Sequence, residues 1–169
     1  FIGLVSSGAL FILAYGAFCL MIISIFFLFY NKSVLLRNRA KNAFGNLEGE
    51  LKRRSDIVPQ LVSAVEGYVA HENNMFSLIA SLRSGAHNGG VEEAKAFRHS
   101  LEAYPAFKSS DLFIDLSNEL VDTEERIAYS RSFYNKTVER YNTNIAQFPY
   151  SFIAWFTHQK PLSFFYFGD

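Results

Sequence analysis

The sequence predicts an all-α protein in which a transmembrane helix is followed by an antiparallel, up-and-down helical bundle with a long last helix. A charge-free apolar run opens the 169 residues, and apolar residues further along recur every three or four positions. No stretch alternates polar and apolar residues for long enough to make a sheet. We therefore divide the chain into a transmembrane anchor (1–30), a four-helix bundle (31–148) and an aromatic-rich tail (149–169).

The run from Phe1 to Phe29 contains no charged residue. At about 1.5 Å per residue it reaches roughly 43 Å as a helix, which exceeds the ~30 Å hydrocarbon core of a bilayer. It is longer than the apolar core of a signal peptide and has no basic leader, so we expect a retained single-pass anchor. The one cysteine, Cys19, lies in this run, and a single cysteine excludes a disulfide framework.

The first charged residues after the apolar run are all basic: Lys32, Arg37, Arg39 and Lys41 precede the first acid, Glu48. By the positive-inside rule, this pattern places the bundle on the cytoplasmic side of the membrane or its organellar equivalent. The four cations are also candidates for contact with anionic lipid headgroups, the alternative being a merely solvated flank.

Helical periodicity predicts a first bundle helix over 30–54. Its apolar stripe is Leu36, Ala40, Ala43, Leu47 and Leu51. Ser55 and Asp56 are good N-cap residues, and Pro59 is tolerated in a first turn, so we expect a second helix to begin there. The glycine-rich segment 84–90 ends it as a turn.

A short third helix is expected over 92–104, stopped by Pro105. The fourth helix, over 111–148, is the longest of the bundle. Its stripe is Leu112, Leu116, Leu120, Thr123, Ile127, Ser130, Tyr134, Val138, Tyr141, Ile145 and Phe148. The average step along this stripe is that of an α-helix.

Composition and motifs argue against several classes of function. The 16 Lys and Arg residues are balanced by 16 Asp and Glu residues, so there is no excess of basic charge for nucleic acid. The sequence contains no nucleotide-binding loop, nucleophile elbow or metal signature. We expect a protein that is not an enzyme, with no cofactor and no small-molecule substrate.

Polar residues near the predicted helix seams are interpreted as a charge-paired network that fixes helix register. They are Arg54, Asp56, His71, Glu72, Glu119, Glu124, Arg126, Arg131, Asn135 and Asn142. Bundles that bind metals carry a Glu followed three residues later by His on two helices, and this sequence has no such pair. Tyr134-Asn135 and Tyr141-Asn142 repeat after seven residues and so share one helix face, where Asn can bridge helices.

The tail is rich in aromatic residues. An up-and-down bundle returns the chain towards the membrane at the end of its fourth helix, so Phe152, Trp155 and Phe156 are candidates for a second contact at the lipid interface. Two alternatives remain open, because the tail could instead fold back on its own bundle or pack on a neighbouring subunit.

Four stretches carry a resemblance to a known family. They are YNKSVLLRNRAKNAF at 30–44, LKRRSDIVPQLVSAVEGYVAHE at 51–72, AYPAFK at 103–108 and ELVDTEERIAYSRSFYNKTVERYNTNIAQFP at 119–149. In this order they resemble the LemA family of membrane proteins. The resemblance implies one membrane anchor, an antiparallel helical bundle and no established enzymatic activity, and magnetosome-associated relatives suggest roles at specialised membranes.

Two functional hypotheses follow. The leading one is a non-enzymatic, single-pass membrane-anchored scaffold or assembly protein that presents its bundle to protein partners or to copies of itself. The alternative is a lipid-binding or membrane-shaping module that uses the basic cluster and the aromatic tail. The expected partners are therefore membrane lipids and either a homo-oligomer or other membrane proteins.

Overall fold

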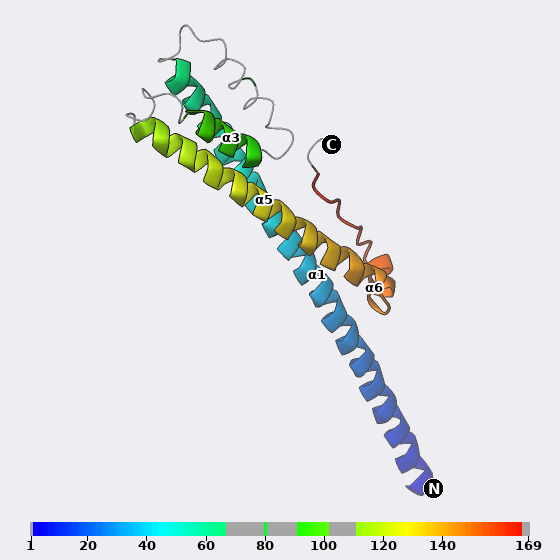
Figure 1. Ribbon diagram of the computed structural model, residues 1–169. Helices are drawn as coiled ribbons and strands as arrows, with labels where there is room; N and C mark the ends of the chain where they lie inside the picture. The colour runs from blue at the N-terminus through cyan, green and yellow to red at the C-terminus, as the bar shows by residue number, and fades with distance from the viewer. Residues whose placement is uncertain (1, 67–79, 81–90, 102–110, 167–169) are drawn as a thin grey trace. The chain divides into compact units, whose positions relative to one another are not determined.

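The computed structural model describes residues 2–66, 80, 91–101 and 111–166, and throughout these ranges the regular secondary structure is helical (Figure 1). The helices are α1 (Ile2–Glu66), α3 (Val91–Leu101), α5 (Asp111–Ala146) and α6 (Tyr150–Phe156). The predicted all-α class, with a long apolar helix at its start, is confirmed. The residues form two compact units, the first from Phe1–Ala40 and Thr137–Ser163, the second from Lys41–Lys136 and Phe164–Asp169.

Helix α1 is continuous where the sequence predicted a boundary between two helices. The expected N-caps Ser55 and Asp56 lie inside α1, and so does Pro59. That prediction was wrong because burial outweighs the local capping signals. The buried residues keep one seven-residue phase past the expected break: Ser33, Ala40, Leu47, Arg54 and Leu61. An unbroken phase keeps one face of the helix in the core across the proline.

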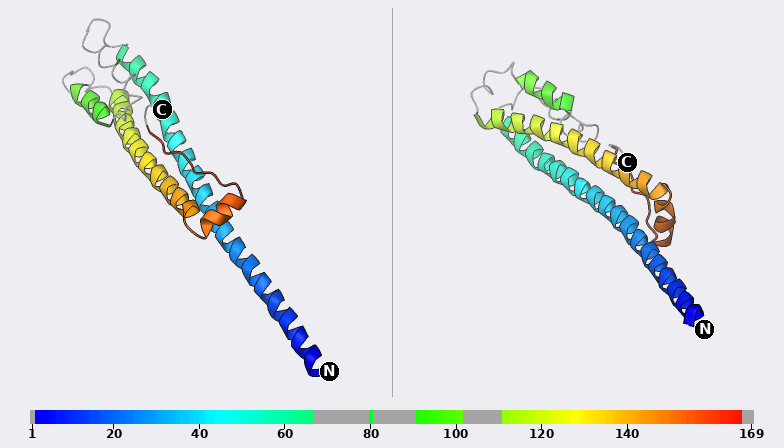
Figure 2. Two further views of the ribbon diagram at one scale, coloured as in Figure 1. Left: turned by 90° about the vertical axis from the view of Figure 1, so that its right-hand side faces the viewer. Right: turned by 90° about the horizontal axis from the view of Figure 1, so that it is seen from below.

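The core of the second unit joins three helices. It consists of Ile57, Leu61 and Val62 from α1, Ala94 and Phe97 from α3, and Leu116, Leu120 and Val121 from α5. Figure 2 shows these three helices packed together. Full burial of one such aliphatic or aromatic side chain contributes roughly 1.5–3 kcal/mol, so this cluster stabilises the unit substantially.

Helices α1 and α5 run antiparallel in the second unit, as predicted. The Phe44 ring lies 5.4 Å from that of Tyr134, whereas Arg54, further along α1, pairs with Glu124, which is earlier in α5. The third predicted helix corresponds to α3; its expected end at 104 and the expected turn at 84–90 lie outside the described residues.

The predicted stripe of α5 forms the buried face of this helix. Eight of its members are buried: Leu116, Leu120, Thr123, Ile127, Tyr134, Val138, Tyr141 and Ile145. Two members were predicted wrongly, because Leu112 is 65% and Phe148 is 87% exposed. Phe148 lies beyond the last residue of α5 and so does not follow its phase, whereas Leu112 is in the first turn, at the exposed end of the helix.

The first unit has a smaller core in which α6 is docked. Tyr141, Ile145 and Ala154 are buried together, with Leu36 and Leu162 packed against them. Figure 1 shows α6 beside the end of α5. This helix was not predicted from the sequence; it follows Pro149 and has only 7 residues.

Candidate functional site

One stretch of α1 is long and apolar enough to cross a membrane. Its most apolar window has a mean hydropathy of 2.6, and none of that window is buried against the rest of the protein. Phe11, Tyr15 and Leu28 are each at least 70% exposed. An apolar face of this length requires an apolar environment, and a lipid bilayer supplies one.

Helix α6 contacts α1 where this apolar stretch ends. The Phe156 ring meets Phe26 edge-on at 6.2 Å, and the Tyr150 ring meets Phe29 edge-on at 4.7 Å. The Lys32 ammonium lies 5.2 Å from the centre of the Tyr150 ring, which is the geometry of a cation–π interaction. These contacts place α6 beside the last uncharged turns of α1 and its first cation.

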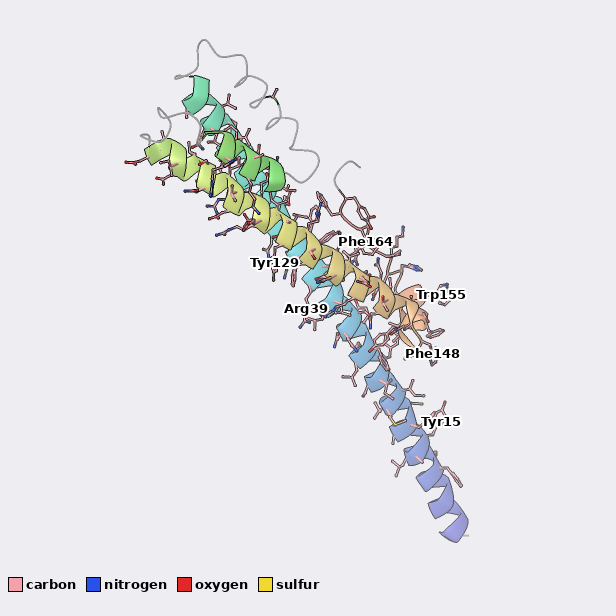
Figure 3. All side chains as sticks on the ribbon, viewed as in Figure 1. Tyr15, Arg39, Tyr129, Phe148, Trp155 and Phe164 are labelled. Carbon is pink, nitrogen blue, oxygen red and sulfur yellow. The ribbon has the colours of Figure 1, made fainter. Side chains whose placement is uncertain are left out.

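The two faces of α6 differ in burial. Ile153 and Ala154 face the core of the first unit and are buried. Phe148, just before the helix, and the α6 residues Phe152, Trp155 and Phe156 are exposed, and Trp155 is 73% exposed. Figure 3 shows Phe148 and Trp155 on the outer side of this part of the unit. We call Phe148, Phe152 and Trp155 the aromatic face of α6.

The predicted basic cluster is at the protein surface. Lys32, Arg37, Arg39 and Lys41 are all exposed on α1, and Figure 3 labels Arg39. Within the described part of the chain, Lys32 is the member of this cluster that lies over an aromatic ring, that of Tyr150. The other cations therefore present their charge to solvent or to any anionic surface nearby.

The C-terminal segment of the first unit folds back on α5 and is held through its main chain. The amide of Asn142 donates to the carbonyl of Leu162 at 2.8 Å and accepts from the Leu162 N–H at 2.9 Å. The Tyr141 hydroxyl donates to the Lys160 carbonyl at 3.1 Å. Of the alternatives left open for the tail, folding back on its own chain therefore describes this segment.

The second unit repeats the same bonding pattern one heptad earlier in α5. The Asn135 amide donates to the Phe165 carbonyl at 3.1 Å and accepts from the Phe165 N–H at 2.9 Å. The two asparagines thus share a role, but it is not the expected bridging of helices. The asparagines bind an extended segment, whose unpaired main-chain groups require partners that a neighbouring helix does not need.

Burial affects the tyrosines of the same two pairs. Removal from water raises the pKa of both Tyr134 and Tyr141 above the ordinary value of 10.0, and the positive charge of Arg37 partly opposes the shift at Tyr141. Both hydroxyls stay protonated well into alkaline solution, so Tyr141 keeps its donor for the Lys160 carbonyl.

Two adjacent arginines of α1 pair with two glutamates of α5 in very different surroundings. Arg54 Nε lies 2.7 Å from Glu124 Oε1, and these side chains are only 7% and 1% exposed. Arg53 donates to Glu119 Oε1 from Nε at 3.1 Å and from Nη2 at 2.8 Å, at the surface. The hydrogen bond to Glu119 raises the pKa of Arg53 above its usual value.

The other predicted network residues are spread over the second unit. Arg126 Nη1 is 4.0 Å from Glu50 Oε1, and the exposed Asp56 accepts a hydrogen bond from Gln60 only through its main-chain carbonyl. Arg131 is half-buried on α5. The two remaining members, His71 and Glu72, lie outside the described residues.

Two polar residues that the sequence reading passed over form a buried contact in the first unit. The Ser33 hydroxyl donates to Asn144 Oδ1 at 3.1 Å, and both residues are buried. A signal for Ser33 was available, because it precedes the buried Ala40 by seven residues. A polar residue in the seam of paired helices fixes their register.

The second unit has a shallow surface hollow on α1 and α5. Its lining is Glu50, Asp122, Glu125, Arg126, Tyr129 and Ser130. Across the part of the chain that the structure describes, no three His, Cys, Asp or Glu residues are grouped to hold a metal ion. The polar residues that the structure brings together form ion pairs and hydrogen bonds to side chains or to the main chain.

Fold and site together define a class of protein: an all-helical chain whose first helix carries a membrane-length apolar stretch and also contributes to two packed cores. The sequence profile of the LemA family matches residues 43–169. The chain therefore belongs to the LemA family.

Individual relatives are distant but cover most of the chain. Protein LemA of Metamycoplasma hominis is 27% identical over 78% of this chain, and the magnetosome protein MamQ of Magnetospirillum gryphiswaldense is 23% identical over 81%. The magnetosome protein MamQ 2 of Paramagnetospirillum magneticum is 24% identical over 80%. The matched regions span 68% of the first relative and 64% of the other two.

Proposed function

We propose that this chain is a non-enzymatic, single-pass membrane-anchored scaffold that presents its helical bundle to protein partners or to copies of itself. One observation carries the proposal. Helix α1 supplies the exposed apolar stretch, buried residues in the core of the second unit and Leu36 packed against the core of the first, so the bundle is built on the anchor helix itself. Membership of the LemA family and the similarity to a magnetosome protein support a role at a membrane.

The second unit offers a surface for such partners on α5. The rings of Tyr129 and Phe133 are stacked with centroids 6.3 Å apart, and both side chains are exposed. Exposed aromatic side chains are enriched in protein–protein interfaces, because each buries a large area and loses little side-chain entropy on binding. The orientation that fits the basic flank of Arg37, Arg39 and Lys41 is a bundle on the cytoplasmic side.

The test is the mass of the full chain after extraction in a mild detergent, with and without chemical cross-linking in the native membrane. We expect a species larger than the monomer, and we expect Tyr129→Ser with Phe133→Ser to shift it towards the monomer. Phe152→Ser is the matched control, since it removes an exposed aromatic side chain from the other unit. A strictly monomeric protein that carries no partner would contradict the scaffold.

A further inference from the structure

We propose that the aromatic face of α6 inserts into the interfacial zone of the membrane that α1 spans, so that the protein contacts lipid at two places. The proposal rests on the membrane anchoring proposed above and adds a defined lipid-binding surface to it. Phe148, Phe152 and Trp155 form this surface, and its ligand is the boundary between lipid headgroups and acyl chains.

The depth of α6 follows from its contacts with α1. Phe156 meets Phe26 within the uncharged run, whereas Tyr150 meets both Phe29 and Lys32. The α1 segment from residue 26 to residue 32 rises about 9 Å. Helices that lie in the interface bury their apolar side about 5–10 Å deep. A bilayer that holds the apolar stretch of α1 therefore has its boundary at the level of α6.

The chemistry of α6 fits this boundary. Residues 148–157 contain no charged side chain, so insertion carries no cost of moving an ion out of water. Ile153 and Ala154 fix one side of the helix to the core, which leaves the aromatic side free to face outward. Trp155 suits the headgroup region because its ring is apolar and its N–H is polar.

The continuity of the two exposed surfaces favours lipid over a protein partner as the occupant. The apolar stretch of α1 is exposed up to the turns that α6 contacts, and Phe156 is itself exposed while it touches Phe26. Whatever solvates that end of α1 must also contact α6. A protein partner that covered the aromatic face alone would separate it from the lipid that surrounds the adjacent apolar stretch of α1.

The experiment uses Trp155, which is the single tryptophan of the chain and needs no substitution. The full chain is reconstituted in phosphatidylcholine vesicles that contain brominated phosphatidylcholine, with bromine either near the headgroup or near the bilayer centre. We expect Trp155 emission to be quenched several-fold more by shallow bromine than by deep bromine, and only weakly by aqueous acrylamide.

A matched variant separates this proposal from the membrane anchor. In Trp155→Phe with Tyr15→Trp, the tryptophan replaces a residue that is 72% exposed in the apolar stretch of α1. This probe should be quenched most by deep bromine. If it is not quenched by either lipid, the anchor fails, and the inference about α6 fails with it.

Two results would overturn the α6 proposal while leaving the anchor intact. Strong quenching of Trp155 by acrylamide but not by brominated lipid would place the aromatic face in water. Protection of Trp155 from both quenchers would mean that protein covers it, and the face would then be an interface with a partner or a second copy.

Discussion

At the scale of single residues, burial decides what each charged pair contributes. Arg53 and Arg54 are neighbours in α1, and each pairs with a glutamate of α5. The Arg53–Glu119 pair is at the surface, where solvent screens the charges and the gain is small. The Arg54–Glu124 pair is buried, so removing one partner leaves the other as an uncompensated charge in the core.

We predict that Glu124→Ala lowers the free energy of unfolding by about 3–5 kcal/mol, because it leaves the Arg54 guanidinium buried without an opposite charge. Glu119→Ala, the matched surface change, should leave the denaturation midpoint nearly unchanged. Urea unfolding of the detergent-solubilised chain, followed by circular dichroism, measures both. Equal effects of the two substitutions would show that the buried pair has no special weight.

The same pair also offers a test of specificity. Replacing both members with apolar residues, Arg54→Met with Glu124→Leu, removes the desolvation cost together with the attraction, so we expect recovery of most of the stability lost in Glu124→Ala. If the double variant is no more stable than Glu124→Ala, the core requires this ion pair for its packing.

The asparagine contacts predict a local effect. Asn142→Ala removes both partners of the Leu162 main chain, and loss of such bonds costs about 1–3 kcal/mol. Hydrogen–deuterium exchange should show the Leu162 amide exchanging about tenfold faster or more, with no change in the buried part of α1. Asn38→Ala, an exposed substitution on α1, is the control. Unchanged exchange in Asn142→Ala would contradict a holding role.

The polar residues that make contacts within the protein were predicted better from the sequence than the partners of those contacts. Arg54, Glu124, Asn135 and Asn142 were all singled out from their helical positions. Their partners could not be read, because an ion pair between residues 70 positions apart depends on how the helices pack. The asparagines were paired with the wrong element, since helical periodicity says nothing about an extended segment.

At the scale of elements, the phase of buried residues is a better guide to α1 than its capping signals. Ser55, Asp56 and Pro59 have the composition of a helix start, yet Arg54 and Leu61 keep the seven-residue phase set by Leu47. A sequence reading that followed this phase would have predicted one helix. The 7 residues of α6, by contrast, are too few to show a periodicity.

Pro59 should therefore reduce the stability of α1. A proline inside a helix destabilises it by about 3 kcal/mol relative to alanine. Replacing the proline by alanine also increases the conformational entropy of the unfolded chain, which offsets up to about 1 kcal/mol of the gain. We expect Pro59→Ala to raise the free energy of unfolding by about 1–2 kcal/mol, measured by thermal melting. Ser63→Ala, an exposed change one turn later, serves as the control. A lower melting temperature for Pro59→Ala would indicate a helix boundary at this residue after all.

At the scale of the whole molecule, a net charge of zero conceals a strong asymmetry along the chain. All four charged residues before Glu48 are basic, which leaves 12 basic and 16 acidic residues in the remainder. An anionic membrane attracts the first group and repels the second. We therefore expect anionic lipid to gather around the basic residues that follow the apolar stretch of α1.

We predict that Arg37→Gln, Arg39→Gln and Lys41→Gln together lower the share of anionic lipid that co-purifies with the chain, as measured by native mass spectrometry. Each basic residue near the surface contributes about 1 kcal/mol, so the enrichment should fall several-fold. Lys32 is kept because its ammonium lies over Tyr150. Lys52→Gln, Lys136→Gln and Arg140→Gln, which remove as many exposed cations elsewhere, should retain the lipid.

The fold class was the most predictable level. A charge-free run and a helical period are properties of composition and spacing alone, so the apolar helix and the buried face of α5 follow from the sequence. The docking of α6 does not, because it depends on Ala154 and Leu162 meeting Tyr141 across a chain reversal.

The asparagine contacts also bear on how this protein can diverge. Asn135 and Asn142 bind only atoms that every amino acid except proline possesses. The exposed side chain of Phe164 can therefore be exchanged over evolutionary time while the segment remains attached. The exposed side chains of this segment could therefore change in evolution, and with them its binding partners, provided that both asparagines are retained and no proline occurs at 162 or 165.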